Sequence, residues 1–168
     1  MKNKIFNDLF VLEIANNHWG SVKRGLDIIN QHSKIVKSNK INAAFKLQIR
    51  DVDNFIHSKF TGNKNIRYIN KTEKTKLSLN EFKILTKQIN KNGHITCATP
   101  FDESSVRICK DLDISIIKIA SSDISDYTLI NEILKLKIPV IVSTGGAQLN
   151  EIDFISEQFE KKKNSPSH

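Results

Sequence analysis

Polar side chains stand at the ends of five short apolar runs in this 168-residue sequence, and their types suit the binding of an anion. Lysine and hydroxyl groups can hold a phosphate or a carboxylate, and a carboxylate side chain can transfer protons. Because the carboxyl ends of parallel strands meet at one face of an α/β protein, all five runs can contribute to one site. The candidate residues are Glu13, Lys46, Gln48, Thr99, Lys118, Ser121, Asp123 and Ser143.

Strand alternation predicts that Glu13, Lys46 and Lys118 all face the interior, with Glu13 sharing its face with Ala15. An unpaired buried charge costs several kcal/mol or shifts its pKa. One lysine can pair with Glu13, and the other then needs an anion. In the alternative, both lysines extend to the mouth of the fold and bridge Glu13 without any ligand.

Several other polar or aromatic residues are predicted to have structural roles. His18 is expected to be a hydrogen-bonding loop residue, and Asn16 and Asn17 are candidates for turn positions with unusual dihedral angles. Asp102 is expected to cap the helix that follows it. Trp19 is expected to cover the rim of the fold.

The elements that must position these residues alternate between strand and helix. Ser78 and Glu81 form a capping box, and a polar stretch from Arg50 to Leu77 is long enough to be a functional loop or a lid. Strands are predicted at 10–15, 43–49, 94–101, 114–121 and 139–144. Helices are predicted at 21–38, 78–93, 102–112 and 127–136, with a last one capped by Asn150.

Two α/β architectures fit this alternation. Five units suffice for an open, flavodoxin-like sheet, and they are too few to close a barrel of eight strands. An open sheet concentrates its site at one switch point, whereas here every strand ends in candidate residues. We therefore predict a (β/α)8 TIM-type barrel of which about the first five β/α units are present, with a non-catalytic flavodoxin-like module as the alternative.

The composition narrows the class of protein. The net charge of +8 would suit nucleic acid, but the lysines are spread along the chain, apart from MKNK at the start and KKK near the end, and no nucleic-acid motif occurs. Cys97 and Cys109 are too few for a disulfide framework or a zinc site, and Cys97 is expected to pack in its strand. No run is long enough to span a membrane. We expect a cytoplasmic protein that binds neither nucleic acid nor membrane.

Five motifs resemble the sialic acid synthase (NeuB) family in order and spacing. EIANNHWGS resembles EIGxNHxGS, AAFKLQ resembles AVKFQ, CATPFDESSV resembles TPFDxxSV, KIASSD resembles KIASGD/E, and STGGAQLNEI resembles STGMAxLxEI. The sequence departs from the family pattern in having Ala15 and Ser122 where glycine is usual and Gly146 where methionine is usual. The Ser122 change bears on sugar specificity.

The resemblance implies a transferase of carbohydrate biosynthesis that condenses phosphoenolpyruvate with N-acetylmannosamine or a related amino sugar, giving a nonulosonic acid and phosphate. By motif position, Lys46, Thr99, Lys118, Ser121 and Ser143 would hold phosphoenolpyruvate. Glu13 would face the sugar as the catalytic candidate. Gln48 and Asp123 would bind substrate, Asp123 as an acidic sugar ligand.

The resemblance also implies features that lie outside this chain. The full-length enzyme is expected to use a divalent metal, Mn2+ or Mg2+, whose ligands come later in the sequence, and to form a homodimer. Residues 1–168 are therefore expected to be a partial barrel domain, without the C-terminal strands and the antifreeze-like domain, and inactive alone. A second enzymatic alternative is a class I aldolase in which Lys118 forms a Schiff base.

Overall fold

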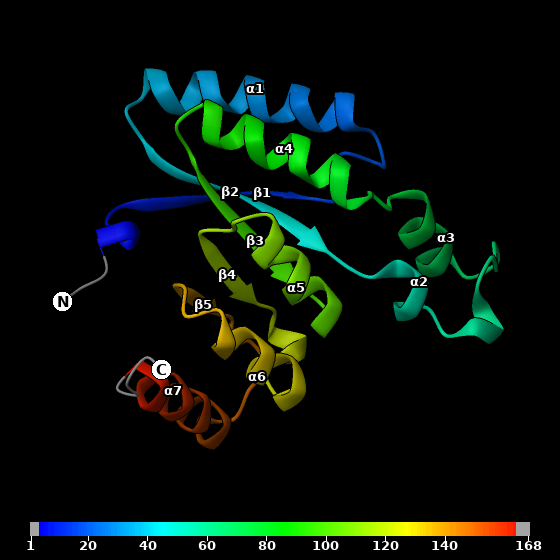
Figure 1. The fold of residues 1–168 in the computed structure, drawn as a ribbon, viewed down its shortest axis with the longest axis vertical. Coiled ribbons are helices and arrows are strands. Elements are labelled where there is room, and N and C mark those ends of the chain that lie inside the picture. The colour runs from blue at the N-terminus through cyan, green and yellow to red at the C-terminus, as the bar shows by residue number, and fades with distance from the viewer. Residues whose placement is uncertain (1–3, 164–168) are drawn as a thin grey trace.

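The computed structural model describes residues 4–163, which form one curved parallel sheet with helices packed on its outer side (Figure 1). The strands run in the contiguous order β1-β2-β3-β4-β5. This order confirms the barrel prediction and excludes the 2-1-3-4-5 order of a flavodoxin-like sheet. The strands are β1 (Leu9–Ala15), β2 (Asn42–Ile49), β3 (Ile95–Pro100), β4 (Ile116–Ile119) and β5 (Val140–Val142).

Helices connect each strand to the next, as predicted. The long ones are α1 (Val22–Ser38), α4 (Leu79–Lys91), α5 (Glu103–Asp111), α6 (Tyr127–Lys135) and α7 (Leu149–Lys163). The stretch after β2 is not irregular, because it contains α2 (Val52–Phe55), the 3₁₀ turn Ser58–Phe60 and α3 (Arg67–Lys74). These elements project beyond the carboxyl end of β2 (Figure 1). The basic clusters at the two ends of the chain lie partly outside the described residues.

Side-chain caps explain where α1 and α4 begin. Ser21 accepts a hydrogen bond from the Arg24 N–H, and Ser78 and Glu81 form the predicted capping box. The prediction for the last helix was wrong, because α7 begins at Leu149 and Asn150 lies inside it. Instead, the Gln148 N–H donates to Glu151 at 2.8 Å, so the glutamate of the first turn satisfies the backbone that enters the helix.

The two faces of the sheet differ in what they bury. On the outer face, Phe45, Leu47, Ile117 and Ile119 pack with the helices in one large hydrophobic core. The inner, concave face holds a small separate cluster of Ala44, Cys97 and Ile116, with partly buried Ile141 and others around it. This division confirms the predicted strand parity, since residues of one strand alternate between the two clusters.

The parity prediction fails at the end of β1. Glu13 lies opposite Lys46, but Ala15 lies opposite Leu47, so Ile14 is an extra residue in a β-bulge. Ile14 is buried in the outer core, and Ala15 has a φ of +46°. Neither Asn16 nor Asn17 has a positive φ, so the unusual dihedral angles fall on Ala15 and on Trp19 (φ +51°) instead. A left-handed Ala15 explains why the family pattern has glycine at this position.

A large cavity lies away from the polar strand ends. It encloses about 760 Å³ beside the edge strand β5, between α6 and α7, and apolar residues such as Ile133, Val140, Ile155 and Phe159 line it. In the described part of the chain, β5 pairs with β4 alone. The cavity therefore belongs to the open edge of the sheet. No helix within residues 4–163 is long and apolar enough to cross a membrane.

Candidate active site at the carboxyl ends of the strands

Lys46 is the buried centre of the polar strand ends. Its side chain is only 5% exposed, and its Nζ lies 2.5 Å from Oε2 of Glu13, which is 48% exposed. Lys46 Nζ also donates to Thr99 Oγ1 at 3.1 Å. The parallel register explains the contact with Glu13, because Glu13 and Lys46 are direct partners across β1 and β2. Lys46 is therefore the lysine that takes the carboxylate of Glu13, which the sequence predicted for one of the two lysines.

Lys118 is the lysine without a partner. It is half-buried on β4, and within residues 4–163 it forms no hydrogen bond or ion pair. Burial lowers the pKa of Lys118, and the positive charge of Lys46 lowers it further, while Glu13 opposes the shift. Two ammonium groups therefore share the mouth of the fold with one directly paired carboxylate, that of Glu13, while Asp123 acts on Lys118 without forming an ion pair with it. Within the described residues, the positive charge of Lys118 has no direct counter-charge.

Hydroxyl groups complete this side of the mouth. Ser121 lies in a 3₁₀ turn, Ser121–Asp123, directly after β4. A Cβ added to Gly145 would lie 3.7 Å from the Ser121 Cβ, so the turns after β4 and β5 adjoin one another. The Ser143 N–H donates to Ile119 O at 3.1 Å and keeps Ser143 next to β4. Among the described residues, no hydrogen bond links the Ser121 or Ser143 hydroxyl to either lysine.

Asp123 is held by its neighbour in the sequence. Ser122 Oγ donates to Asp123 Oδ1 at 2.8 Å, and Asp123 Oδ2 is buried without a hydrogen-bond partner in the described part of the chain. Ser122 is the residue that replaces the family glycine. The replacement therefore acts directly on the carboxylate that the sequence assigned to the sugar.

Arg50 is a site residue that sequence reasoning missed. It follows β2, and its guanidinium lies 3.6 Å from the centre of the Phe101 ring and donates to Gln48 Oε1 at 3.2 Å. Burial lowers the pKa of Arg50, and Tyr68, Asp123 and Asp102 oppose that shift. The sequence did carry a signal for this residue. Arg50 is a charged residue two positions after Gln48, and strand alternation places both side chains on the same face.

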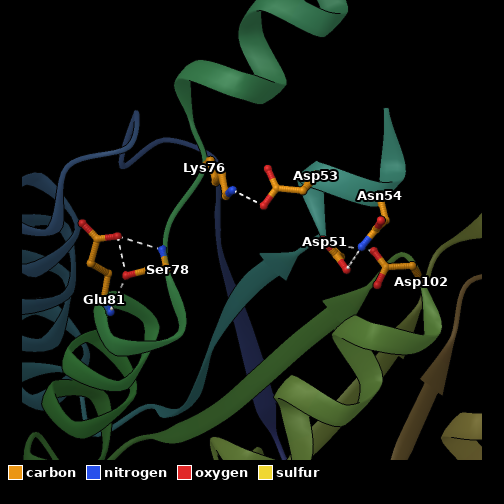
Figure 2. Close-up of polar contacts among 7 residues, drawn as sticks. All are labelled: Asp51, Asp53, Asn54, Lys76, Ser78, Glu81 and Asp102. Carbon is orange, nitrogen blue, oxygen red and sulfur yellow. Dashed lines mark hydrogen bonds and ion pairs between the residues drawn. The ribbon is translucent and has the colours of Figure 1, made fainter. Parts of the chain in front are cut away.

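The segment after Arg50 is tied to its surroundings at both ends (Figure 2). The Asp51 N–H donates to Asp102 Oδ2 at 2.8 Å, and Asn54 bonds to Asp51. Lys76, where the chain returns, pairs with Asp53 at 2.5 Å. These contacts close the excursion of residues 51–76 on itself and fix the point at which it leaves β2.

The returning chain also packs against the loop after β1. Gly20 has a φ of +73°, and a Cβ at this position would lie 2.5 Å from the carbonyl oxygen of Lys74. No L-residue with a side chain fits such an approach without a backbone shift. The glycine of the first motif is therefore required by the close approach of α3.

The remaining sequence predictions are mostly structural ones. His18 is buried, its Nδ1 accepts from the Gly20 N–H at 3.1 Å, and burial lowers its pKa. Asp102 caps α5 through the Ser105 N–H at 2.7 Å, as predicted. Trp19 is 64% exposed and carries Arg24 on its ring. Cys97 is a free, buried thiol whose pKa burial raises to about 12, so it is not a nucleophile at neutral pH.

The residues that the structure describes do not form a metal site. Between positions 4 and 163, no group of three or more histidine, cysteine, aspartate or glutamate side chains comes together in a way that could hold a metal ion. Glu13 is already paired with Lys46. The residues described therefore do not by themselves fit the metal of the sequence-based expectation.

The fold and the site together define five β/α units of a TIM-type barrel with a cationic mouth. The NeuB family matches residues 34–166, and the chain belongs to this family. Its sequence is 36% identical over 81 residues to N,N'-diacetyllegionaminic acid synthase of Campylobacter jejuni, a match that covers 48% of this chain and 24% of that enzyme.

Solved structures share the fold over almost the whole chain. A putative spore coat polysaccharide biosynthesis protein E from Chromobacterium violaceum superimposes with a TM-score of 0.90 and 35% identity, over 94% of this chain and 47% of that one. An N-acetylneuraminic acid synthetase from Leptospira borgpetersenii, solved with citrate, gives a TM-score of 0.78 and 28% identity, over 93% and 50%. This chain spans about half the length of those two proteins.

Proposed function

We propose that this chain is the phosphoenolpyruvate-binding part of an enzyme that condenses phosphoenolpyruvate with N-acetylmannosamine or a related amino sugar. In this reaction, C3 of phosphoenolpyruvate forms a carbon–carbon bond with the aldehyde carbon of the open-chain sugar, whose oxygen takes up a proton. Water adds at C2, the bond from C2 to the phosphate oxygen breaks, and phosphate leaves. The product is a nonulosonic acid. Family membership and the named activities of the relatives support the proposal.

The observation that carries the proposal is the unpaired, half-buried Lys118 beside the paired Lys46. A lone ammonium group in this position is costly, and a bound trianion removes the cost by supplying counter-charge. Thr99 reaches Lys46 directly, and Ser121 and Ser143 offer hydroxyl donors at the next two strand ends. Hydroxyl and ammonium groups on adjacent strands suit the phosphate and the carboxylate of one small ligand.

Glu13 is proposed to act at the sugar side of this anion. Its carboxylate is half-exposed and accepts from Lys46, so it lies at the mouth. In that position it can orient the attacking water or move a proton to or from the sugar oxygen. A divalent metal, Mn2+ or Mg2+, and a homodimeric arrangement remain proposals for the full-length enzyme, and no step of the chain's own residues depends on them.

Binding of phosphoenolpyruvate to the 168-residue chain tests the proposal directly. Isothermal titration calorimetry should show binding by the parent chain, weakened at least about tenfold in Lys118→Met, because a charge-assisted contact is lost. Lys87→Met is the matched control, since Lys87 is exposed on α4. Affinity should fall as pH rises through the lowered pKa of Lys118, where the ammonium group loses its proton. Equal affinities of the parent and Lys118→Met would refute the proposal.

The unpaired Lys118 also favours a second candidate, the class I aldolase. A lysine beside another cation, with a lowered pKa, is the usual Schiff-base nucleophile. Pyruvate and borohydride would then leave a covalent adduct on Lys118, detectable by mass spectrometry of a tryptic digest. We expect no adduct, and a stable one at Lys118 would establish the aldolase in place of the synthase.

A further inference from the structure

Among the described residues, two buried polar atoms without hydrogen-bond partners belong to side chains at the mouth of the fold whose charges act on one another. They are Nε of Arg50, after β2, and Oδ2 of Asp123, after β4. Leaving a buried donor or acceptor without a hydrogen bond is energetically costly. Such groups in a native protein call for a partner that the chain itself does not supply. Arg50 Nε is a donor and Asp123 Oδ2 is an acceptor. A single ligand that satisfies both must therefore accept one hydrogen bond and donate another.

Arg50 is held rigidly in its position. On one side of it, Ile49 O accepts from the Phe101 N–H at 3.1 Å, and on the other the Asp51 N–H is fixed on Asp102 (Figure 2). The guanidinium stacks on Phe101 and donates one N–H to Gln48. A planar fork fixed in this way keeps its remaining donors in place, so little entropy is lost when they bind a ligand.

The charges divide the mouth into two ends of opposite balance. At the first end, Lys46 and Lys118 face the carboxylate of Glu13, which is ion-paired with Lys46, and Asp123 also acts on Lys118 without forming an ion pair with it. At the second end, Arg50 lies in the field of the two carboxylates of Asp123 and Asp102. An anion is therefore attracted to the lysine end and is not attracted to the arginine end. A neutral ligand rich in hydroxyl and carbonyl oxygens suits the second end, since Arg50 can donate to it and Asp123 can accept from it.

We propose that Arg50 is a specificity-determining residue that binds the neutral co-substrate, an open-chain sugar bearing an N-acyl group, together with Asp123. The Arg50 guanidinium donates to a carbonyl or hydroxyl oxygen of the sugar, and Asp123 Oδ2 accepts from a hydroxyl. Ser122 occupies Asp123 Oδ1 and so leaves Oδ2 as the free acceptor. This inference rests on the proposed function and adds to it the residue that selects the sugar.

Saturation-transfer NMR on the 168-residue chain, with N-acetylmannosamine as the probe and phosphoenolpyruvate present, tests this inference. Arg50→Lys keeps the charge and loses the planar fork, so sugar affinity should fall about tenfold or more. The affinity for phosphoenolpyruvate, measured by calorimetry, should stay within about twofold of the parent value. Arg24→Lys is the matched control, because Arg24 also stacks on an aromatic ring, that of Trp19.

A second variant separates a binding role from a folding defect. Asp123→Asn should also weaken the binding of the sugar. It should not weaken the binding of phosphoenolpyruvate, because it removes negative charge from the surroundings of Lys118. An unchanged 15N–1H correlation spectrum away from the mouth shows that each variant is folded. Sugar affinity unchanged in Arg50→Lys would overturn the inference, and so would a parent chain that binds phosphoenolpyruvate but no sugar. Loss of both ligands in Arg50→Lys would assign Arg50 to the anion end and refute its role in selecting the sugar. A parent chain that binds neither ligand would instead refute the proposed function.

Discussion

The outer and inner faces of the sheet come from the same five strands and have opposite characters. On the outer face, Phe45 and Ile117 are completely buried under helices in a continuous apolar core. On the inner face, one step along the chain, Lys46 is buried with an ion pair, and Lys118 forms no hydrogen bond or ion pair with any other described residue. The outer face stabilises the fold through packing. The inner face keeps charges that packing alone would not favour, which is typical of a site that binds a ligand.

The largest expected effect tests the outer face. Phe45→Ala should lower the free energy of unfolding by about 3 to 5 kcal/mol, because it opens a cavity in a closely packed core. Ile141→Ala, on the open inner face, should cost only about 1 to 2 kcal/mol, since Ile141 is already partly exposed. Urea denaturation followed by circular dichroism measures both. Equal costs would show that the two faces contribute alike to stability.

The next largest effect concerns Gly20, in the loop after β1. Gly20→Ala should destabilise the chain by about 2 to 4 kcal/mol, since backbone strain adds to the overlap with Lys74 O. Gly62→Ala is the matched control, because Gly62 has a similar φ of +74° and nothing within 4 Å of the added Cβ. It should cost about 1 kcal/mol. Thermal denaturation of the two variants decides whether the close approach of α3, rather than the dihedral angle, requires the glycine.

A pH-dependent change in the free energy of unfolding is expected from His18, which is buried in the loop after β1. Burial lowers its pKa, so the unfolded chain binds the proton more readily than the folded one. The free energy of unfolding should therefore decrease as pH falls from about 6.5 towards the lowered pKa. His18→Gln should make this decrease shallower between pH 7.5 and pH 5. Denaturation curves with the same pH dependence in both proteins would contradict the assignment.

The smallest expected change in the free energy of unfolding concerns Lys46, on the inner face of the sheet. Lys46→Met should change the free energy of unfolding by less than about 1 kcal/mol, because the lost ion pair is offset by the lost cost of burying an ammonium group. Glu13 is half-exposed and can be hydrated when left alone. Binding of phosphoenolpyruvate should nevertheless be lost. A destabilisation as large as that of Phe45→Ala would show that Lys46 is a structural residue.

Much of the fold followed from local patterns in the sequence. The alternation of β-branched runs with amphipathic segments predicted all five strands and the helices between them, and capping chemistry placed Ser21, Ser78 and Asp102 correctly. Two predictions failed where the signal was not local. The bulge at Ile14 depends on how β1 meets β2 and on a left-handed Ala15. The helices of residues 52–74 depend on contacts with Asp102, the N-cap of α5, and with the loop after β1.

The sequence by itself determined which chemical groups stand at the strand ends, because motif order and strand parity are properties of the chain. It also predicted that one of the two lysines would be left without a carboxylate. Only the tertiary structure decided which one, since the parallel register sets Glu13 beside Lys46 and leaves Lys118 alone. The role of Arg50 was likewise hidden, because Phe101, Asp102 and Asp123, which surround it, are brought to β2 by the curvature and order of the sheet.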